Sequence, residues 1–252
     1  MKIDFPSPHH LPQQRRLWQD AFGDTDAFLD SFFQTAYSPD RCRCVFMGED
    51  IAAILYWIDC CVQEQKLAYL YAVVTHPGHR GRGLCRMLMD NTHSLLSSRG
   101  YAGAILVPHK ESLRAMYAGM GYRNTGGLTS FSCTASDTPV SLRAVAPAEF
   151  AALRRTLLPE NAVIQEGDGL ALLAQQLQFY AGENFLLAAY GENGVLSVPE
   201  LLGNASAAPD ILNALEYPHG NFRVPGSNIP FAMFHPLTDG AIFPSYFGFA
   251  FD

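Results

Sequence analysis

The sequence lacks the run of about 20 apolar residues that a membrane-spanning helix requires, and its N-terminal segment MKIDFPSPHHLPQQRR lacks the apolar core of a secretory signal. Basic residues are scarce in the second half, where residues 135–252 carry 4 Lys and Arg against 12 Asp and Glu. Nucleic-acid binding needs clustered basic side chains, which this half does not supply. These absences predict a soluble cytoplasmic protein that binds neither nucleic acid nor membranes.

No C-x-x-C pair occurs among the six cysteines, and the closest pairs have C-x-C or C-C spacing. Cys60 and Cys61 are neighbours on an expected strand, so their side chains point to opposite faces and cannot easily share a metal ion. The pair His76-x-x-His79 has no third ligand in its loop. We therefore expect free buried thiols in a reducing compartment and no metal site.

The overall composition is that of an ordinary globular protein, with 48% hydrophobic and 16% charged residues in a chain of 252. This length suits one large domain or two modest ones. The first 134 residues are nearly balanced in charge, whereas the remainder is strongly acidic, and the polar segment ASDTP at 135–139 separates them. We predict two domains, residues 1–134 and 140–252, joined by this linker.

Apolar periodicity in the first half alternates between helical and strand patterns. Helices are expected at Leu11–Phe22, Asp26–Tyr37, Gly83–Ser98 and Glu111–Gly119, and strands at Cys42–Met47, Ile51–Val62, Leu67–Thr75, Tyr101–Val107 and Leu128–Cys133. A meander followed by strand–helix–strand predicts an α+β fold whose sheet is antiparallel at one end and has a parallel pair in the middle. The second half predicts helices at Pro147–Leu158, Gly169–Tyr180 and Pro209–Leu215, with paired strands at Phe185–Tyr190 and Val195–Leu202.

A basic loop, HRGRGLC at 79–85, joins the Leu67–Thr75 strand to the following helix. The start of a helix leaves backbone N–H groups free and its dipole favours an anion, while Gly81 and Gly83 let the backbone approach closely. Arg80 and Arg82 add positive charge. A P-loop is excluded because no Lys-Ser or Lys-Thr follows these glycines. The dinucleotide fingerprint is excluded because its third glycine is missing. A basic turn that merely caps the helix is the structural alternative.

Two motifs in this order resemble those of the GNAT superfamily of N-acetyltransferases. The segment Arg80–Cys85 is similar to the family signature [Q/R]-x-x-G-x-[G/A], with Cys85 in place of the last small residue, and the preceding run YAVVTHPG fits the strand and loop before it. Downstream, Tyr117–Tyr122 matches the family pattern Y-x-x-x-G-Y. An asparagine often found seven residues before that tyrosine is replaced by Lys110. The resemblance covers roughly residues 10–134.

The resemblance implies a GNAT fold, a mixed and mostly antiparallel sheet flanked by helices, with acetyl-CoA as co-substrate. The backbone of Val73 and Val74 would then pair with the pantetheine arm. The pyrophosphate would be held by the basic loop, that is by His79, Arg80, Gly81, Arg82, Gly83, Leu84 and Cys85. The thioester would lie in an opening between the Leu67–Thr75 and Tyr101–Val107 strands.

Direct acetyl transfer needs a neutral amine and a proton for the departing thiolate. Tyr117 is the expected proton donor, because members of the family place a tyrosine there. Its structural alternative is an aromatic residue that packs into the core. The general base is less defined: His76 at the mouth of the expected site is our candidate, and the alternatives are His109, Glu111, Tyr71 or an ordered water.

Residues 140–252 have an order of elements similar to an incomplete GNAT-like domain, and they lack an R-x-x-G-x-G loop, so we expect no second cofactor site. Aromatic residues at 222–234 and 243–251 are expected to shape the acceptor pocket, and the acidic balance suits a cationic amine. Some enzymes of paired GNAT-like domains direct the C-terminal carboxylate into the catalytic domain. Asp252 is a candidate for that role, and a terminal edge strand is the alternative.

The resulting prediction is an acetyl-CoA-dependent N-acetyltransferase that acts on a primary amine of a small molecule or peptide. A non-catalytic acyl-CoA-binding regulatory module is the alternative, since the base is undefined and the family asparagine is missing. A longer acyl donor is a third option, because the basic loop contacts only the CoA end. A homodimer is compatible with these features.

Overall fold

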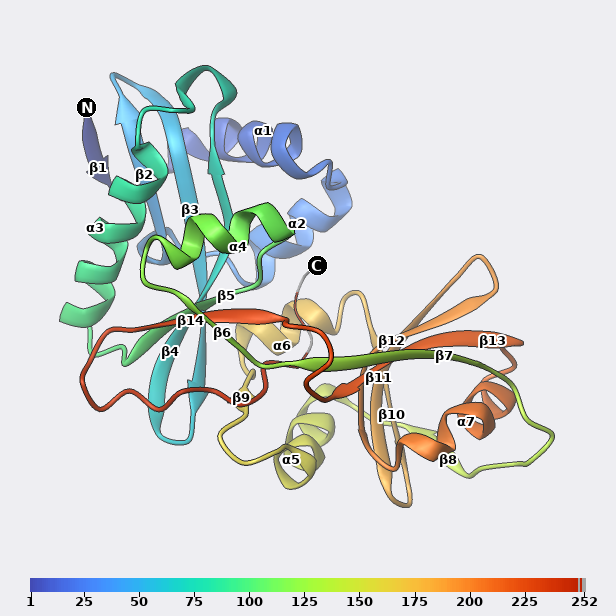
Figure 1. The fold of residues 1–252 in the computed structure, drawn as a ribbon. Helices are drawn as coiled ribbons and strands as arrows, with labels where there is room; N and C mark the ends of the chain where they lie inside the picture. The colour runs from blue at the N-terminus through green and yellow to red at the C-terminus, as the bar shows by residue number, and fades with distance from the viewer. Residues whose placement is uncertain (249, 251–252) are drawn as a thin grey trace.

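The structure is a computed structural model, and it describes residues 1–248 and residue 250. Two β-sheets make up the molecule and lie side by side (Figure 1). The first sheet has the order β1-β2-β3-β4-β5-β14-β6, with β9 paired to β3. Its strands are β1 (Lys2–Asp4), β2 (Cys42–Met47), β3 (Asp50–Val62), β4 (Gln65–Thr75), β5 (Gly103–Leu106), β6 (Arg123–Thr125), β9 (Val163–Ile164) and β14 (Ala232–Pro236).

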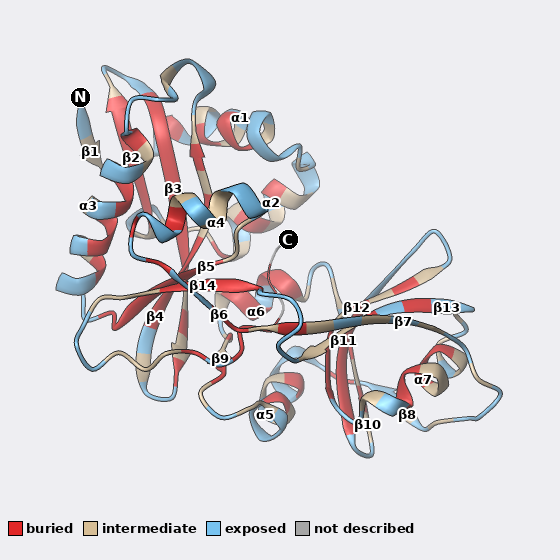
Figure 2. Cartoon of the chain, in the orientation of Figure 1, coloured by how far each residue is buried: buried red, intermediate tan, exposed pale blue. Residues whose placement is uncertain are grey.

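Strand β3 shows why this sheet is covered on both faces. Alternate side chains of a strand point to opposite faces, and nearly all of β3 is buried. Ile54, Tyr56 and Ile58 belong to one core cluster, which also contains residues of α1 (Leu11–Phe22) and α2 (Asp26–Thr35). Leu55 and Trp57 belong to a second cluster, shared with α3 (Leu84–Ser98) and α4 (Glu111–Ala118). The helices therefore form a layer on each face, and Figure 2 shows the buried strands between them.

The second sheet has the order β7-β13-β12-β11-β10-β8. Its strands are β7 (Leu128–Thr134), β8 (Leu142–Ala144), β10 (Gln178–Gly182), β11 (Phe185–Glu192), β12 (Val195–Gly203) and β13 (His219–Pro225). The remaining helices are α5 (Pro147–Leu157), α6 (Asp168–Leu173) and α7 (Ala208–Ala214), with short 3-10 turns η1 (Pro8–His10), η2 (Pro39–Arg41), η3 (Pro77–His79) and η4 (Ala205–Ala207). β12 and β13 are parallel, as β4 and β5 are in the first sheet. The expected α+β architecture is confirmed.

The two sheets exchange strands. β7 follows the first sheet in sequence but pairs with β13 along its whole length, from Leu128 opposite Pro225 to Thr134 opposite His219. In return, β14 lies between β5 and β6 in the first sheet, and Phe234 is fully buried there (Figure 1). The expected division at residues 134 and 140 does not coincide with the division between the sheets, because β7 joins the second sheet while β9 and β14 join the first.

One expected helix is wrong. The run 169–180 was predicted as a single helix, but α6 ends at Leu173 and β10 begins at Gln178. β10 lies between β8 and β11, and the ring of Phe179 stacks on Phe150 at a centroid distance of 4.2 Å. Apolar residues in this run satisfy both periods, so the sheet partners decided the outcome. None of the helices in the described part of the chain has the length and apolar character needed to cross a membrane.

Candidate cofactor and acceptor site

The parallel strands β4 and β5 separate partway along their length. They pair at Leu67 with Gly103, Ala68 with Ala104 and Tyr69 with Ile105. Beyond Tyr69 the backbone of β4 is irregular: its register with β3 shifts, and Ala72 has a φ of 47°. Such a bulge bends a strand and redirects its side chains. The opening expected between the two strands is therefore present in the fold.

A cavity of about 740 Å³ lies at this opening, and we call it the central cavity. Its first-sheet side includes Tyr71 and Val73 of β4, Val107 beyond β5, and Tyr117 of α4. Its other side comes from the second sheet and includes Tyr190, Ser197 and Asn221. Of the two valines expected to hold pantetheine, Val73 lines the cavity, whereas Val74 is buried and pairs with Ile54 of β3.

The basic loop has the geometry of an anion site. Gly81 and Gly83 have φ values of 73° and 74°, a region that side chains rarely adopt, and a Cβ at either position would meet nothing within 4 Å. The space around both glycines is thus open to a ligand. Arg82 is exposed between them, and the Nε of Arg80 donates to the carbonyl of Thr75 at 3.2 Å.

Free backbone donors cluster at this loop. α3 has Gly83 as its N-cap with no side-chain cap, and the first bond of the helix runs from the N–H of Met87 to the carbonyl of Gly83 at 3.1 Å. Within residues 1–248, the N–H groups of positions 81–83 have no backbone acceptor. Consecutive free N–H groups at a helix start favour a phosphate oxygen. The loop residues therefore fit a pyrophosphate.

Two residues of the loop are partly buried. The Nδ1 of His79 is shielded from solvent and has no hydrogen-bond partner among the described residues, so a ligand would satisfy it. Cys85 packs beside the α3–α4 core cluster, and burial raises the pKa of its thiol. Cys85 therefore stays neutral and acts as the small apolar residue that its place in the signature requires.

Tyr117, the expected proton donor, lies on α4 and is 6% exposed. It lines the central cavity, and none of the described residues hydrogen-bonds its hydroxyl. Burial, and then the proximity of Cys85, raise the pKa of Tyr117 well above its ordinary value. The guanidinium of Arg86 donates to the carbonyl of Gly119 at 2.8 Å, which ties the start of α3 to the end of α4. A direct hydrogen bond thus links the residue that follows the first motif to Gly119 of the second motif.

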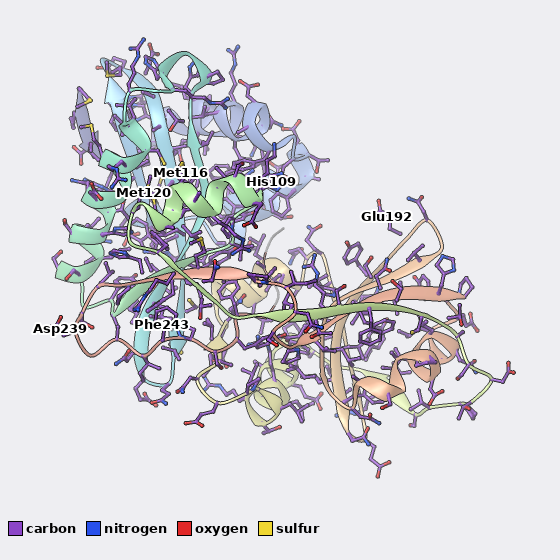
Figure 3. The ribbon with its side chains drawn as sticks, in the orientation of Figure 1. His109, Met116, Met120, Glu192, Asp239 and Phe243 are labelled. Atoms are coloured by element: carbon purple, nitrogen blue, oxygen red, sulfur yellow. The ribbon has the colours of Figure 1, made fainter. Side chains whose placement is uncertain are left out.

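The base candidates are placed differently. His76 is exposed and does not line the central cavity, and its Nδ1 accepts a hydrogen bond from the N–H of Gly78 at 3.2 Å. His109 and Tyr71 both line the cavity, whereas Glu111 is exposed and pairs with Arg114 at 3.1 Å. Figure 3 shows His109 just before α4, on the side that faces the β11–β12 hairpin. The structure thus brings Tyr117 together with His109 rather than with His76.

The C-terminal carboxylate, a further candidate, lies outside the described residues. Ala250, which is described, lines the central cavity. The segments 222–234 and 243–251, whose aromatic residues were expected to shape an acceptor pocket, reach the cavity through Arg223 and Ala250, and none of their described aromatic residues lines it.

One charged residue of the cavity was not identified as a site residue from the sequence. Asp24 follows Gly23, which ends α1 with a φ of 75°, at a position where an acidic side chain often caps the next helix. Thr25 is that cap, since its side chain accepts from the N–H of Phe28. The Oδ2 of Asp24 instead accepts from the indole Nε1 of Trp18 at 2.7 Å, and Asp24 lines the central cavity. The sequence signal that could have identified Asp24 is an acidic residue at a helix junction where its neighbour, Thr25, serves as the cap.

Three potential metal ligands come together away from the cavity lining. The ligand atoms of His9, His10 and Glu49 lie within 4.8 Å of one another. The hydroxyl of Ser7 contacts the Nδ1 atoms of both histidines, at 3.1 and 2.8 Å. These side chains are not among those that line the central cavity.

Residues 2–125 match the family model described as an acetyltransferase (GNAT) domain. Residues 2–125 are accordingly a GNAT acetyltransferase domain, as the two motifs predicted. The match of this domain supports acyl transfer in general, with an acyl-CoA as co-substrate. A search of curated protein sequences found no match.

Solved structures share the fold over nearly the whole chain. A GCN5-related N-acetyltransferase from Kribbella flavida has a TM-score of 0.72 at 16% identity, covering 94% of this chain and 72% of that one. One from Anabaena variabilis has a TM-score of 0.72 at 13% identity, covering 94% and 73%. A tandem GNAT protein from the clavulanic acid pathway has a TM-score of 0.59 at 12% identity, covering 95% and 100%. The similarity to this tandem protein is consistent with a GNAT-like fold in the second part of the chain.

Proposed function

We propose that the protein transfers an acetyl group from acetyl-CoA directly to a primary amine of a small molecule or peptide. The observation that carries this proposal is the central cavity, which joins the opening between β4 and β5 to Tyr117 and to a wall from the second sheet. One space thus has room for a thioester, a proton donor and an acceptor. In this proposal, residues 1–134 form the side of the cavity that binds the cofactor, and residues 140–252 form most of the opposite wall.

The basic loop would hold the cofactor. The free N–H groups at 81–83 and the start of α3 receive the pyrophosphate, while Val73 faces the pantetheine arm. The acceptor nitrogen attacks the thioester carbonyl, the new C–N bond forms and the C–S bond breaks. Tyr117 gives its proton to the departing thiolate. Its raised pKa keeps that proton in place until the thiolate, a base, develops beside it.

The acceptor must lose a proton before or during the attack. His109 is the histidine that lines the central cavity, so the proposal assigns the base role to His109, directly or through a water. His76 retains a structural role, because its Nδ1 caps the turn that leads into the basic loop.

Binding and turnover are tested separately. Acetyl-CoA or CoA should raise the melting temperature, and a panel of primary amines should then release free CoA in the presence of acetyl-CoA. Stabilisation by acetyl-CoA without CoA release from any amine would favour the non-catalytic acyl-CoA-binding module. Faster turnover with longer acyl-CoA donors than with acetyl-CoA would mean that the acyl donor is one of these longer acyl-CoA molecules. Absence of any stabilisation would contradict the assignment of the basic loop.

A further inference from the structure

Asp24 is a carboxylate without a cation. Acidic residues of the next helix, α2, form ion pairs, as Asp26 and Asp30 do with Arg15 at 3.3 and 2.8 Å. In the described part of the chain, no basic group lies in ion-pair range of Asp24, and the indole of Trp18 supplies its one hydrogen bond. Asp24 is nevertheless half-buried, and it lines the central cavity. A half-buried carboxylate in such a place is completed by a positive charge on a ligand.

The walls around Asp24 favour the same kind of ligand. Trp18, Phe22 and Phe28 line the cavity with it, and the rings of Phe22 and Phe28 lie 6.2 and 6.4 Å from that of Trp18. Tyr190 of β11 faces the same space from the second sheet and is 42% exposed. Aromatic faces attract ammonium groups, and apolar walls strengthen the attraction between unlike charges.

Asp24 is not suited to hold the nitrogen that reacts. A carboxylate beside an amine stabilises the ammonium form, which cannot attack a thioester. The position of Asp24 agrees with this, because the Trp18 ring contacts Asp24 through Nε1 and packs edge-on against Tyr71 of β4 at 5.3 Å. The indole of Trp18 therefore lies between Asp24 and the opening between β4 and β5.

On the basis of the proposed function, we infer that the acceptor is an amine with a second cationic group, such as a diamine, and that Asp24 binds this second ammonium. The reacting amine then lies near Tyr117 and the splayed strands, while the distal ammonium lies between Asp24 and the aromatic walls. The distal charge contributes to binding in the ground state and the transition state alike, so its loss raises KM more than it lowers kcat.

The test uses the full chain and linear diamines from putrescine to diaminooctane, each compared with the monoamine of equal length. For the diamine of best length, the wild type should show a kcat/KM roughly tenfold or more above that of its monoamine. Asp24→Asn should reduce this diamine-to-monoamine ratio by roughly tenfold, mainly through KM. The substitution keeps an oxygen that accepts from Trp18, so the local geometry is retained. Asp26→Asn, whose carboxylate pairs with Arg15 and is not part of the lining, should leave the ratio as in the wild type.

Each outcome separates the inference from the proposed function. Equal kcat/KM for diamines and monoamines, or an unchanged ratio in Asp24→Asn, overturns the role of Asp24 while acetyl transfer stands. Failure of every amine to release CoA, with acetyl-CoA still bound, overturns acetyl transfer itself. A normal thermal shift of Asp24→Asn with acetyl-CoA shows that its cofactor side is intact.

Discussion

The ring of Phe234 lies so close to Gly103 that a Cβ on Gly103 would overlap it. Gly103 is the first residue of β5, and Phe234 is in β14, which reaches the first sheet from the far end of the chain. This contact fits the exchanged strand into the sheet at a position where only glycine leaves room. The exchange of β7 and β14 thereby joins both sheets, and the central cavity between them, into one folded body.

Gly103→Ala should destabilise the protein by about 1–3 kcal/mol, because the added methyl forces Phe234 or β14 to shift. Phe234→Leu creates space at the same point, so the double variant should lose less stability than the two single variants summed. Urea unfolding monitored by tryptophan fluorescence and by circular dichroism measures both effects. Additive losses would mean that the two positions do not interact.

Gly83→Ala should weaken acetyl-CoA binding by roughly tenfold or more, since its φ of 74° places the backbone donors of the basic loop. Gly48→Ala is the matched control: its φ is 69° in the β2–β3 turn, and a Cβ there also meets open space. Both variants should lose about 1–2 kcal/mol of stability from backbone strain. Calorimetric titration with acetyl-CoA should separate them, and equal affinity losses would contradict the assignment of the loop.

Tyr117→Phe should lower kcat roughly a hundredfold or more while acetyl-CoA binding is kept, because the thiolate loses its proton donor. Tyr122→Phe is a suitable control, since Tyr122 packs against Tyr117 at 5.7 Å but does not line the cavity. The raised pKa of Tyr117 also means that its proton is retained through the ordinary range of tyrosine titration. Assays of CoA release against pH should therefore show no loss of activity attributable to Tyr117 near pH 10. Normal turnover in Tyr117→Phe would remove it from this role.

A buried histidine pair should make stability fall in acid. His93 and His235 stack at 4.3 Å, and His93 shares a 2.7 Å hydrogen bond with Tyr122. Burial, and then His235, lower the pKa of His93 to about 3. The unfolded chain binds this proton more readily than the folded one, so the stabilisation is complete above about pH 6.5 and is lost as the pH falls towards 3.

Urea unfolding across this window should show a stability loss on the order of a few kcal/mol in the wild type. His93→Gln, which keeps a partner for Tyr122 but does not titrate, should show a shallower dependence on pH. The same slope in both proteins would assign the acid sensitivity to other groups.

Local signals along the chain predicted much of the fold. Gly23 and Thr25 mark the junction of α1 and α2, and the apolar run Ile51–Val62 indicated the long strand β3. The helix predicted at 169–180 was wrong because the apolar residues of this run suit either a helix or a strand. Pairing with β8 and β11 stabilises its last part as the strand β10. The exchange of strands between the sheets could not be predicted from local sequence patterns, since pairing partners such as β5 and β14 are far apart in the chain.

The sequence by itself determined the geometry of the basic loop, because the N–H groups, glycines and arginines of residues 79–85 depend on the local conformation of one strand–loop–helix unit. The tertiary structure alone decided which side chains share the central cavity. Asp24, His109 and Tyr190 come from three distant segments, and they face one cavity because the helices and the exchanged strands pack the two sheets together. Side chains that meet only through packing have no fixed spacing in the sequence, so no motif could have identified them.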